Sequence, residues 1–249
     1  ALRLSQQAGW NQCRADWRRL VDLYPDRCFA GVVDDDLVAT STLATYGGVV
    51  GWVGMMLVDE NHRRQGYGTQ LLDRALTEAE RRDIGVVGLD ATTAGQPLYQ
   101  RHGFNTVDEI NRWSGTVQPL QETTAVKTGV PADNTDVYKF DTAVCGVDRS
   151  NLLRHLLTSS AATGFVCESD DIVHGYAIVR PGRTHWQIGP LVAADQTTAT
   201  TLLAAAANQV GDDPVIIDAV ADDSTTPLLQ QCGLSVQRSL SRMIQHGEQ

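Results

Sequence analysis

The chain has 249 residues, of which 42% are hydrophobic and 20% charged, a composition typical of globular rather than disordered proteins. Thirty acidic residues against twenty basic ones give a formal net charge of −10, which argues against binding of the nucleic-acid backbone through an overall positive field. No apolar run approaches the roughly 18 residues of a membrane helix and no basic-then-apolar leader opens the sequence, so we expect neither a membrane-spanning nor a secreted protein.

The hydrophobic pattern of the first half predicts alternating helices and strands. Residues 10–24 carry apolar side chains at three-and-four spacing, which predicts an amphipathic helix. Two apolar runs around the acidic residues 34–36 predict a hairpin with a solvated turn. Further strands are expected at 52–58, 86–91 and 106–114, and further helices at 68–83 and 96–102. This order predicts an α/β fold built on a mixed sheet.

Residues 58–69 link a predicted strand to a predicted helix and contain the strongest functional signal in the sequence. Gly66 and Gly68 let a ligand approach the backbone closely, so that amides at the helix start can point outward. These amides, the helix dipole, Arg63 and Arg64 together predict a site for a pyrophosphate. The pattern lacks the Gly-Lys-Ser/Thr ending of the Walker loop and the triple glycine of the Rossmann loop.

An internal repeat sets the domain organisation, because four blocks of the first half recur in the second half in the same order. The paired blocks are residues 29–39 with 165–175, 51–58 with 185–192, 89–91 with 217–219, and 97–104 with 227–234. We interpret the chain as two copies of one unit, at residues 1–118 and 119–249. Residues 116–131, which contain two prolines and a glycine, are predicted to be the linker.

The five cysteines are odd in number and none stands in a C-x-x-C spacing, so we expect reduced thiols in a cytoplasm and no metal site. Only two lysines, Lys127 and Lys139, accompany many arginines, and Asp outnumbers Glu. GC-rich codon usage and adaptation to high salt both account for this bias, and the sequence favours neither.

Two motifs resemble the GNAT superfamily of acetyl-CoA-dependent N-acetyltransferases. The phosphate loop of the family, Gln/Arg-x-x-Gly-x-Gly/Ala, stands here as residues 63–68, and its Leu-Tyr-x-x-x-Gly-Phe segment stands as residues 98–104. The resemblance covers residues 1–115 closely, and the second half is similar to the diverged domain of a two-domain branch of the family. It implies tandem GNAT-like acyl-CoA N-acyltransferase domains.

The resemblance also implies roles for individual residues. Acetyl-CoA would be the cosubstrate, its pantetheine arm bound by backbone groups of Met56, Leu57 and Val58, with one amide polarising the thioester carbonyl. Its pyrophosphate would lie on the turn formed by Arg63, Arg64, Gln65, Gly66, Tyr67, Gly68 and Thr69. Tyr99 would protonate the departing thiolate as a general acid. Many relatives have Asn seven residues before this tyrosine, where the present chain has Thr92.

The second copy lacks these residues. Residues 193–199, which follow its corresponding strand, contain neither glycine nor arginine, and Asp195 would repel a pyrophosphate. Leu229 stands at the position of Tyr99 and has no proton to donate. We therefore predict a degenerate second domain without a cofactor site.

The expected activity is direct transfer of an acetyl group to a primary amine of a small molecule or peptide. Glu60, His62 and Asp90 lie near the loop as candidate general bases, and none is preferred. Residues 9–12 are expected on the first helix, where this fold lines the acceptor pocket.

The alternative is a non-catalytic acetyl-CoA-binding module that senses the cofactor or scaffolds a partner. Tyr99 favours the enzyme, because a sensor needs only the loop. The acceptor and the oligomeric state are left open.

Overall fold

A computed structural model describes residues 1–118 and 126–246. The chain divides into two compact units. Unit 1 consists of Ala1–Glu109 together with the end of the chain from Leu240 onward, and unit 2 consists of Ile110–Ser239. Part of the predicted linker and the proposed domain boundary at residue 119 fall on residues 119–125, outside the described residues.

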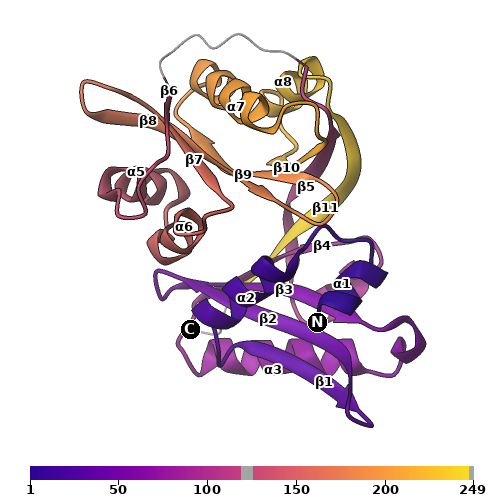
Figure 1. Cartoon of the computed structure of the whole chain (residues 1–249). Helices are drawn as coiled ribbons and strands as arrows, with labels where there is room; N and C mark the ends of the chain where they lie inside the picture. The colour runs from indigo at the N-terminus through magenta and orange to yellow at the C-terminus, as the bar shows by residue number, and fades with distance from the viewer. Residues whose placement is uncertain (119–125, 247–249) are drawn as a thin grey trace. The chain divides into compact units, whose positions relative to one another are not determined.

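Unit 1 has a mixed sheet with helices on both of its faces. Its strands follow the order β1-β2-β3-β4-β11, in which β3 and β4 are parallel and the other pairs antiparallel, and the last strand, β11 (Ser235–His246), comes from the end of the chain. Helices α1 and α2 lie on one face and α3 on the opposite face (Figure 1). The elements are α1 (Leu2–Gln7), α2 (Arg14–Leu23), β1 (Cys28–Val33), β2 (Asp36–Tyr46), β3 (Val50–Val58), the 3-10 helix η1 (Glu60–His62), α3 (Tyr67–Glu80), β4 (Val86–Ala91) and α4 (Gln96–Arg101).

The core of unit 1 lies between the sheet and α3. Leu72, Ala75 and Ala79 of α3 pack against buried residues of the strands, as the spacing of these apolar residues predicts. The acidic hairpin is also confirmed, with Asp34 and Asp35 both at positive φ (48° and 66°) in the turn between β1 and β2. Consecutive positive φ values match the right-handed twist of the two strands.

The predicted helix at residues 10–24 is wrong in its first turn. Gly9, at φ 69°, follows α1, and α2 begins only after Cys13, whose backbone N–H donates to the Asp16 carboxylate at 2.9 Å. This capping arrangement fixes the start of α2 at Arg14. Trp10 and Gln12 therefore lie between two helices rather than on one.

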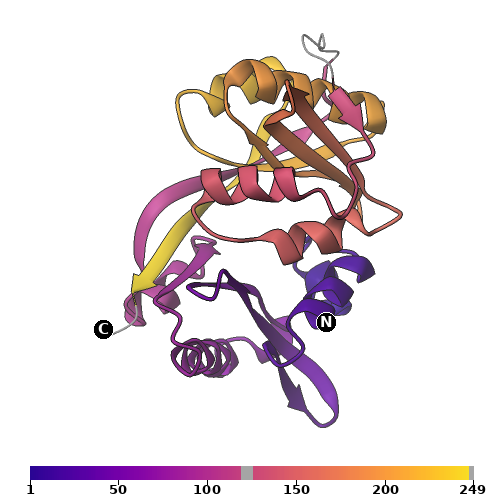
Figure 2. The same cartoon turned by 90° about the vertical axis from the view of Figure 1, so that its left-hand side faces the viewer.

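Unit 2 repeats the same architecture. Its strands follow the order β5-β10-β9-β8-β7-β6, with α5 and α6 on one face and α7 and α8 on the other (Figure 2). The core packs Leu202, Leu203 and Ala206 of α7 against the sheet. The elements are β6 (Val126–Thr128), α5 (Thr135–Cys145), α6 (Ser150–Leu157), β7 (Thr163–Ser169), β8 (Ile172–Pro181), β9 (Trp186–Ala193), α7 (Gln196–Val210), β10 (Val215–Val220) and α8 (Thr225–Gln231).

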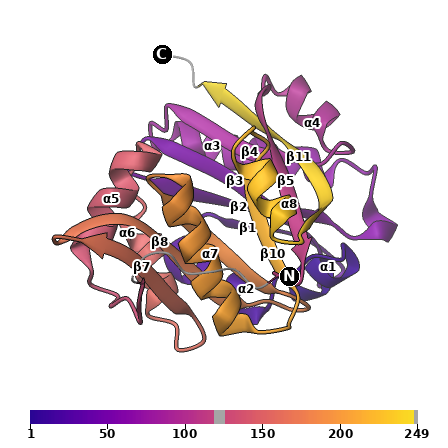
Figure 3. The ribbon, with the colours of Figure 1, turned by 90° about the horizontal axis from the view of Figure 1, so that it is seen from above.

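The closing strands of the two units are exchanged. The strand predicted at residues 106–114 exists as β5 (Asn105–Gly115), but from Ile110 onward it pairs with β10 of unit 2 (Figure 3). In return, β11 (Ser235–His246) pairs with β4 of unit 1 from Ser241 onward. Residues 106–114 were predicted as a strand of the first copy, and from Ile110 onward this strand instead belongs to the sheet of unit 2. Their polar and apolar pattern specifies a strand but not its neighbour.

Each exchanged strand forms the same cross-strand ion pair. Arg242 of β11 lies opposite Asp90 of β4, and Arg112 of β5 lies opposite Asp218 of β10. Both guanidinium groups donate two hydrogen bonds to the opposite carboxylate, at 2.9 and 3.1 Å in unit 1 and at 2.7 and 2.6 Å in unit 2. The two aspartates occupy equivalent positions of the sequence repeat. Bidentate pairs of this kind add geometric specificity to the strand pairing.

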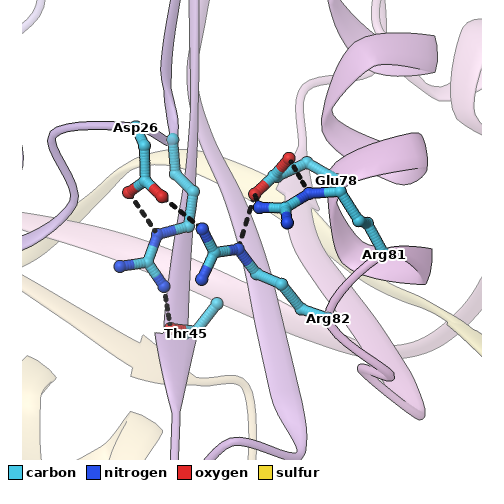
Figure 4. Close-up of polar contacts among 6 residues, drawn as sticks. Asp26, Thr45, Glu78, Arg81 and Arg82 are labelled. Carbon is cyan, nitrogen blue, oxygen red and sulfur yellow. Dashed lines mark hydrogen bonds and ion pairs between the residues drawn. The ribbon is translucent and has the colours of Figure 1, made fainter.

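The end of α3 is joined to the start of β1 by a network of charges (Figure 4). The Glu78 carboxylate is buried and accepts hydrogen bonds from Arg81 (3.0 and 2.7 Å) and Arg82 (2.5 Å). Arg82 also pairs with Asp26, which contacts Arg27 at 3.4 Å. Hydrogen bonds from Arg81 and then Arg82 lower the pKa of Glu78 from 4.5 to about 2.

Because the pKa of Glu78 is lowered by folding, its contribution to stability is present above pH 4.5 and is lost as the pH falls toward 2. We expect Glu78→Gln to lower Tm by roughly 5 °C at pH 7, and the difference from the unaltered chain to shrink between pH 5 and 3. Thermal unfolding across this pH range measures it. Glu80→Gln, an exposed change on the same helix, is the control and should leave Tm unchanged. A Tm difference that stays constant from pH 7 to 3 would contradict the assignment.

Candidate active site

A β-bulge interrupts β3 in unit 1. Thr40 pairs with Leu57 and Thr42 with Gly54, so Met55 and Met56 both lie opposite Ser41. Met55 has φ 49°, and its carbonyl accepts a hydrogen bond of 2.9 Å from the Thr40 hydroxyl. Bulges bend a strand and redirect its backbone groups. The bulge thus falls at the start of the residues predicted to bind pantetheine.

Strands β3 and β4 part just before this bulge. Their parallel pairing covers Val50–Trp52 and Val86–Gly88, although β3 runs on to Val58 and β4 to Ala91. The last residues of β3 therefore have backbone groups that point toward β4 and form no hydrogen bonds in a ladder with that strand. Unpaired strand edges are templates for hydrogen bonding to another extended group. Met56, Leu57 and Val58 lie on this edge, with Leu57 buried and the other two half-buried.

Asp59 anchors the chain directly after β3, a role that the sequence did not reveal. Its buried carboxylate pairs with Arg3 of α1 and accepts the backbone N–H of Asn61 at 3.0 Å. One oxygen lies 3.3 Å from Nδ1 of His62. The hydrogen bond from Arg3, followed by that from Asn61, lowers the pKa of Asp59 to about 2. The start of the loop is therefore held by a permanently charged group.

Residues 63–66, which we call the glycine loop, lead into α3 and include two residues at positive φ. Arg64 has φ 63° and Gly66, the N-cap of α3, has φ 88°. Arg63 and Arg64 are exposed, and Nε of Arg63 donates to the Val58 carbonyl at 3.3 Å. The side-chain amide of Gln65 donates to the Asn61 carbonyl at 3.2 Å.

No side chain in the described part of the chain caps the N-terminus of α3. The first amides of the helix, at Tyr67, Gly68 and Thr69, have no partner within the helix because no turn precedes them. Together with the exposed arginines they present hydrogen-bond donors and positive charge at one point. This arrangement suits a phosphate group.

Gly68 brings α3, α4 and the end of β3 together. A Cβ atom on Gly68 would lie 3.7 Å from Cδ2 of Leu98 and 3.8 Å from Cγ2 of Val58. Nε2 of His102, which follows α4, lies 2.9 Å from the Asp73 carboxylate of α3. The two predicted motifs are therefore adjacent in the fold.

Tyr99 lies on α4 with only 8% of its surface exposed. Its ring packs edge-on against Phe104, with 6.0 Å between the ring centroids. Burial raises the pKa of Tyr99 to about 12. The phenol therefore keeps its proton at neutral pH, as a proton donor must.

The three candidate general bases have different surroundings. Asp90 is engaged by Arg242 of the exchanged strand, and His62 lies against Asp59. Glu60 is exposed and lies 3.8 Å from Arg63. Thr92 is exposed after β4, and its carbonyl accepts hydrogen bonds from residues that begin α4.

The corresponding region of unit 2 has the same backbone plan but different groups. Gly189 and Pro190 form the bulge opposite Ile178, and Pro190 has no N–H to donate. The Asp195 carboxylate caps α7 by accepting the Thr198 N–H at 2.8 Å. The position where α3 can receive an anion is thus filled in α7 by a negative charge of the protein. Leu229, in place of Tyr99, is buried in the core.

Three further features bear on ligands and surroundings. Among the described residues, no cluster of three or more His, Cys, Asp or Glu side chains is arranged to hold a metal ion. None of the described helices combines the length and apolar character needed to cross a membrane. All five cysteines lie among the described residues, and none of them forms a disulfide there.

Comparison with known proteins identifies the family. A model described as "Acetyltransferase (GNAT) family" matches residues 3–104, and one described as "Acetyltransferase (GNAT) domain" matches residues 137–249. The chain is 30% identical over 202 residues to the holothin acyltransferase of Pseudoalteromonas sp., covering 81% of this chain and 68% of the relative. It is 27% identical over 233 residues to the uncharacterized N-acetyltransferase YitH of Bacillus subtilis, covering 90% and 79%.

A solved structure agrees with this result. The crystal structure of a proposed acetyltransferase from Pyrococcus horikoshii superposes with a TM-score of 0.81 at 25% identity, covering 94% of this chain and 78% of that one. The expected α/β fold with two GNAT domains is therefore confirmed. The chain belongs to the GNAT acetyltransferase family, with one GNAT domain matched in each half.

Proposed function

We propose that the chain transfers an acetyl group from acetyl-CoA directly to a primary amine, using a single site in unit 1. The observation that carries this proposal is the contrast between the two equivalent helix starts. The first amides of α3 have no side-chain cap, whereas α7 is capped by Asp195. An uncapped helix start beside two exposed arginines suits the pyrophosphate of a nucleotide cosubstrate.

The proposed reaction uses the parted strands and Tyr99. Backbone groups of Met56, Leu57 and Val58 hydrogen-bond the pantetheine arm, and one amide of this segment polarises the thioester carbonyl. The neutral amine attacks that carbonyl, the bond from carbon to sulfur breaks, and the sulfur leaves as a thiolate. Tyr99 gives this thiolate its proton and is reprotonated from solvent, and the amine loses one proton to solvent or to a base. The products are an N-acetyl amine and free CoA.

Calorimetry with acetyl-CoA, followed by a screen of amines for release of free CoA, tests the proposal. The panel contains amino acids, polyamines, peptides and holothin, which gives the Pseudoalteromonas relative its name. Saturable binding with release of CoA on at least one amine is expected. Binding without turnover on any amine would favour a sensor of acetyl-CoA, and absence of binding would refute the cosubstrate.

We expect one molecule of acetyl-CoA per chain, because the second helix start is capped by Asp195 and the second bulge contains Pro190. Titration of the whole chain by calorimetry should give a stoichiometry near one. Asp195→Asn is the control. It retains an oxygen that can cap α7, so the stoichiometry should not change. A stoichiometry near two in the unaltered chain would overturn the assignment of unit 2 as degenerate.

A further inference from the structure

A tryptophan ring is enclosed at the point where β3 and β4 part. Trp52 is the last residue of β3 paired with β4, and its partner is Gly88. A Cβ atom on Gly88 would lie 2.4 Å from a ring carbon of Trp52, so the indole lies directly on the backbone of β4. The guanidinium of Arg242 lies over the same ring, 5.0 Å from its centroid. The ring is therefore in contact with β4 and with β11.

Arg242 contacts both strands on either side of this point. It lies over Trp52 of β3 and donates two hydrogen bonds to Asp90 of β4, two residues beyond the last pair. A rigid planar group that stacks on a ring and binds a carboxylate bidentately fixes the separation of the two side chains. The hydrogen-bond ladder between β3 and β4 ends here. Beyond this point, the side-chain contacts of Arg242 connect the two strands.

The cluster lies on the face of the sheet opposite α3. Val87 and Leu89 of β4 belong to the core under α3, and successive side chains of a strand point to opposite faces. Gly88 and Asp90 therefore face the other way, and Trp52 and Arg242 lie with them. On β3, the bulge at Met55 and Met56 follows Trp52 by three residues.

We propose that Arg242 is a positioning residue that fixes the separation of β3 and β4 at the acyl end of the acetyl-CoA site. The inference rests on the proposed function, which assigns the thioester to the bulge of β3. Arg242 fixes Trp52 against Gly88 and so determines the path of β3 into the bulge. Because β11 is encoded by the second half of the chain, the degenerate copy completes the site of the first copy with this strand.

Unit 2 offers a matched control. Arg112 pairs with Asp218 in the same bidentate manner and on the equivalent strand, but in a unit to which we assign no cosubstrate. Arg242→Leu and Arg112→Leu each remove one bidentate ion pair between an exchanged strand and its neighbour. Both changes should lower Tm, whereas only the first should alter the acyl site.

The test is calorimetry of the whole chain and its variants with acetyl-CoA and with CoA. Arg242→Leu should raise the Kd for acetyl-CoA about 10-fold and that for CoA by less than about threefold, because the glycine loop is untouched. Arg112→Leu should leave both Kd values within about threefold of the unaltered chain. A change in the ratio of the two Kd values is not expected from loss of stability alone.

The outcomes separate the two proposals. If the unaltered chain binds neither ligand, the proposed function fails. If it binds both, and Arg242→Leu and Arg112→Leu change the two Kd values alike, the positioning role of Arg242 is refuted.

Arg242→Lys keeps the charge without the bidentate geometry and serves if Arg242→Leu does not fold. Arg242→Lys should weaken the binding of acetyl-CoA more than the binding of CoA. An unchanged ratio of the two Kd values would equally refute the positioning role of Arg242.

Discussion

Replacing Tyr99 with Phe is expected to lower kcat about 100-fold while leaving the Kd for acetyl-CoA nearly unchanged. The change removes the phenolic proton donor and almost no volume from a side chain that is 8% exposed. Because burial raises the pKa of Tyr99 to about 12, the phenol stays protonated and able to donate until the pH approaches that value. Ionisation of Tyr99 should therefore not limit turnover between pH 6 and 10. Initial rates and calorimetry across this pH range measure both effects.

Tyr24→Phe is the matched control for this variant. Tyr24 is also buried in unit 1, and burial raises its pKa as well, but it lies at the end of α2. Its replacement should leave kcat within about twofold. If Tyr99→Phe behaves like Tyr24→Phe at every pH, Tyr99 is a packing residue and another group protonates the thiolate.

Replacing Gly66 with Val is expected to weaken acetyl-CoA binding by roughly tenfold or more, about 1.4 kcal/mol. Gly66 has φ 88°, a conformation that β-branched residues avoid, so the variant must rebuild the turn into α3. The added side chain also covers the backbone at the helix start, where the pyrophosphate is proposed to lie. Calorimetry at a temperature well below Tm gives the affinity.

Gly146→Val provides the comparison. Gly146 has φ 72° at the end of α5 in unit 2, and a Cβ atom there would meet nothing within 4 Å. The same backbone strain should lower Tm without changing the affinity for acetyl-CoA. An unchanged affinity in Gly66→Val would remove the glycine loop from the binding site.

Elements fixed by local pattern were predictable from the sequence. The apolar spacing of Leu71, Leu72 and Ala75 predicted α3 because each of these side chains is buried on one helix face. The limits of β4 were predicted without error, since a short apolar run bounded by turn signals is typical of a buried strand. The site motifs were identified because their glycines and arginines are adjacent in sequence.

Features that depend on distant residues were not predictable. The pattern of β5 shows that it is a strand, but not that its neighbour is β10. Arg112 and Asp218, which pair across these two strands, lie 106 positions apart. Asp59 was overlooked because its main partner, Arg3, lies 56 residues away. We predicted the start of α2 too early, because the helical spacing of apolar residues extends back to Trp10. In the structure, the capping by Asp16 makes the helix begin at Arg14.

The exchange of β5 and β11 bears on the evolution of a duplicated gene. If the second copy binds no cosubstrate, as proposed above, its deletion would still remove the strand that covers β4. The bare edge would expose a row of N–H and C=O groups and invite association with other chains. A chain without its second half would have an unpaired edge at β4 in the sheet of unit 1. The backbone hydrogen bonds between β11 and β4 would thus favour retention of the second half of the chain even without a reaction of its own.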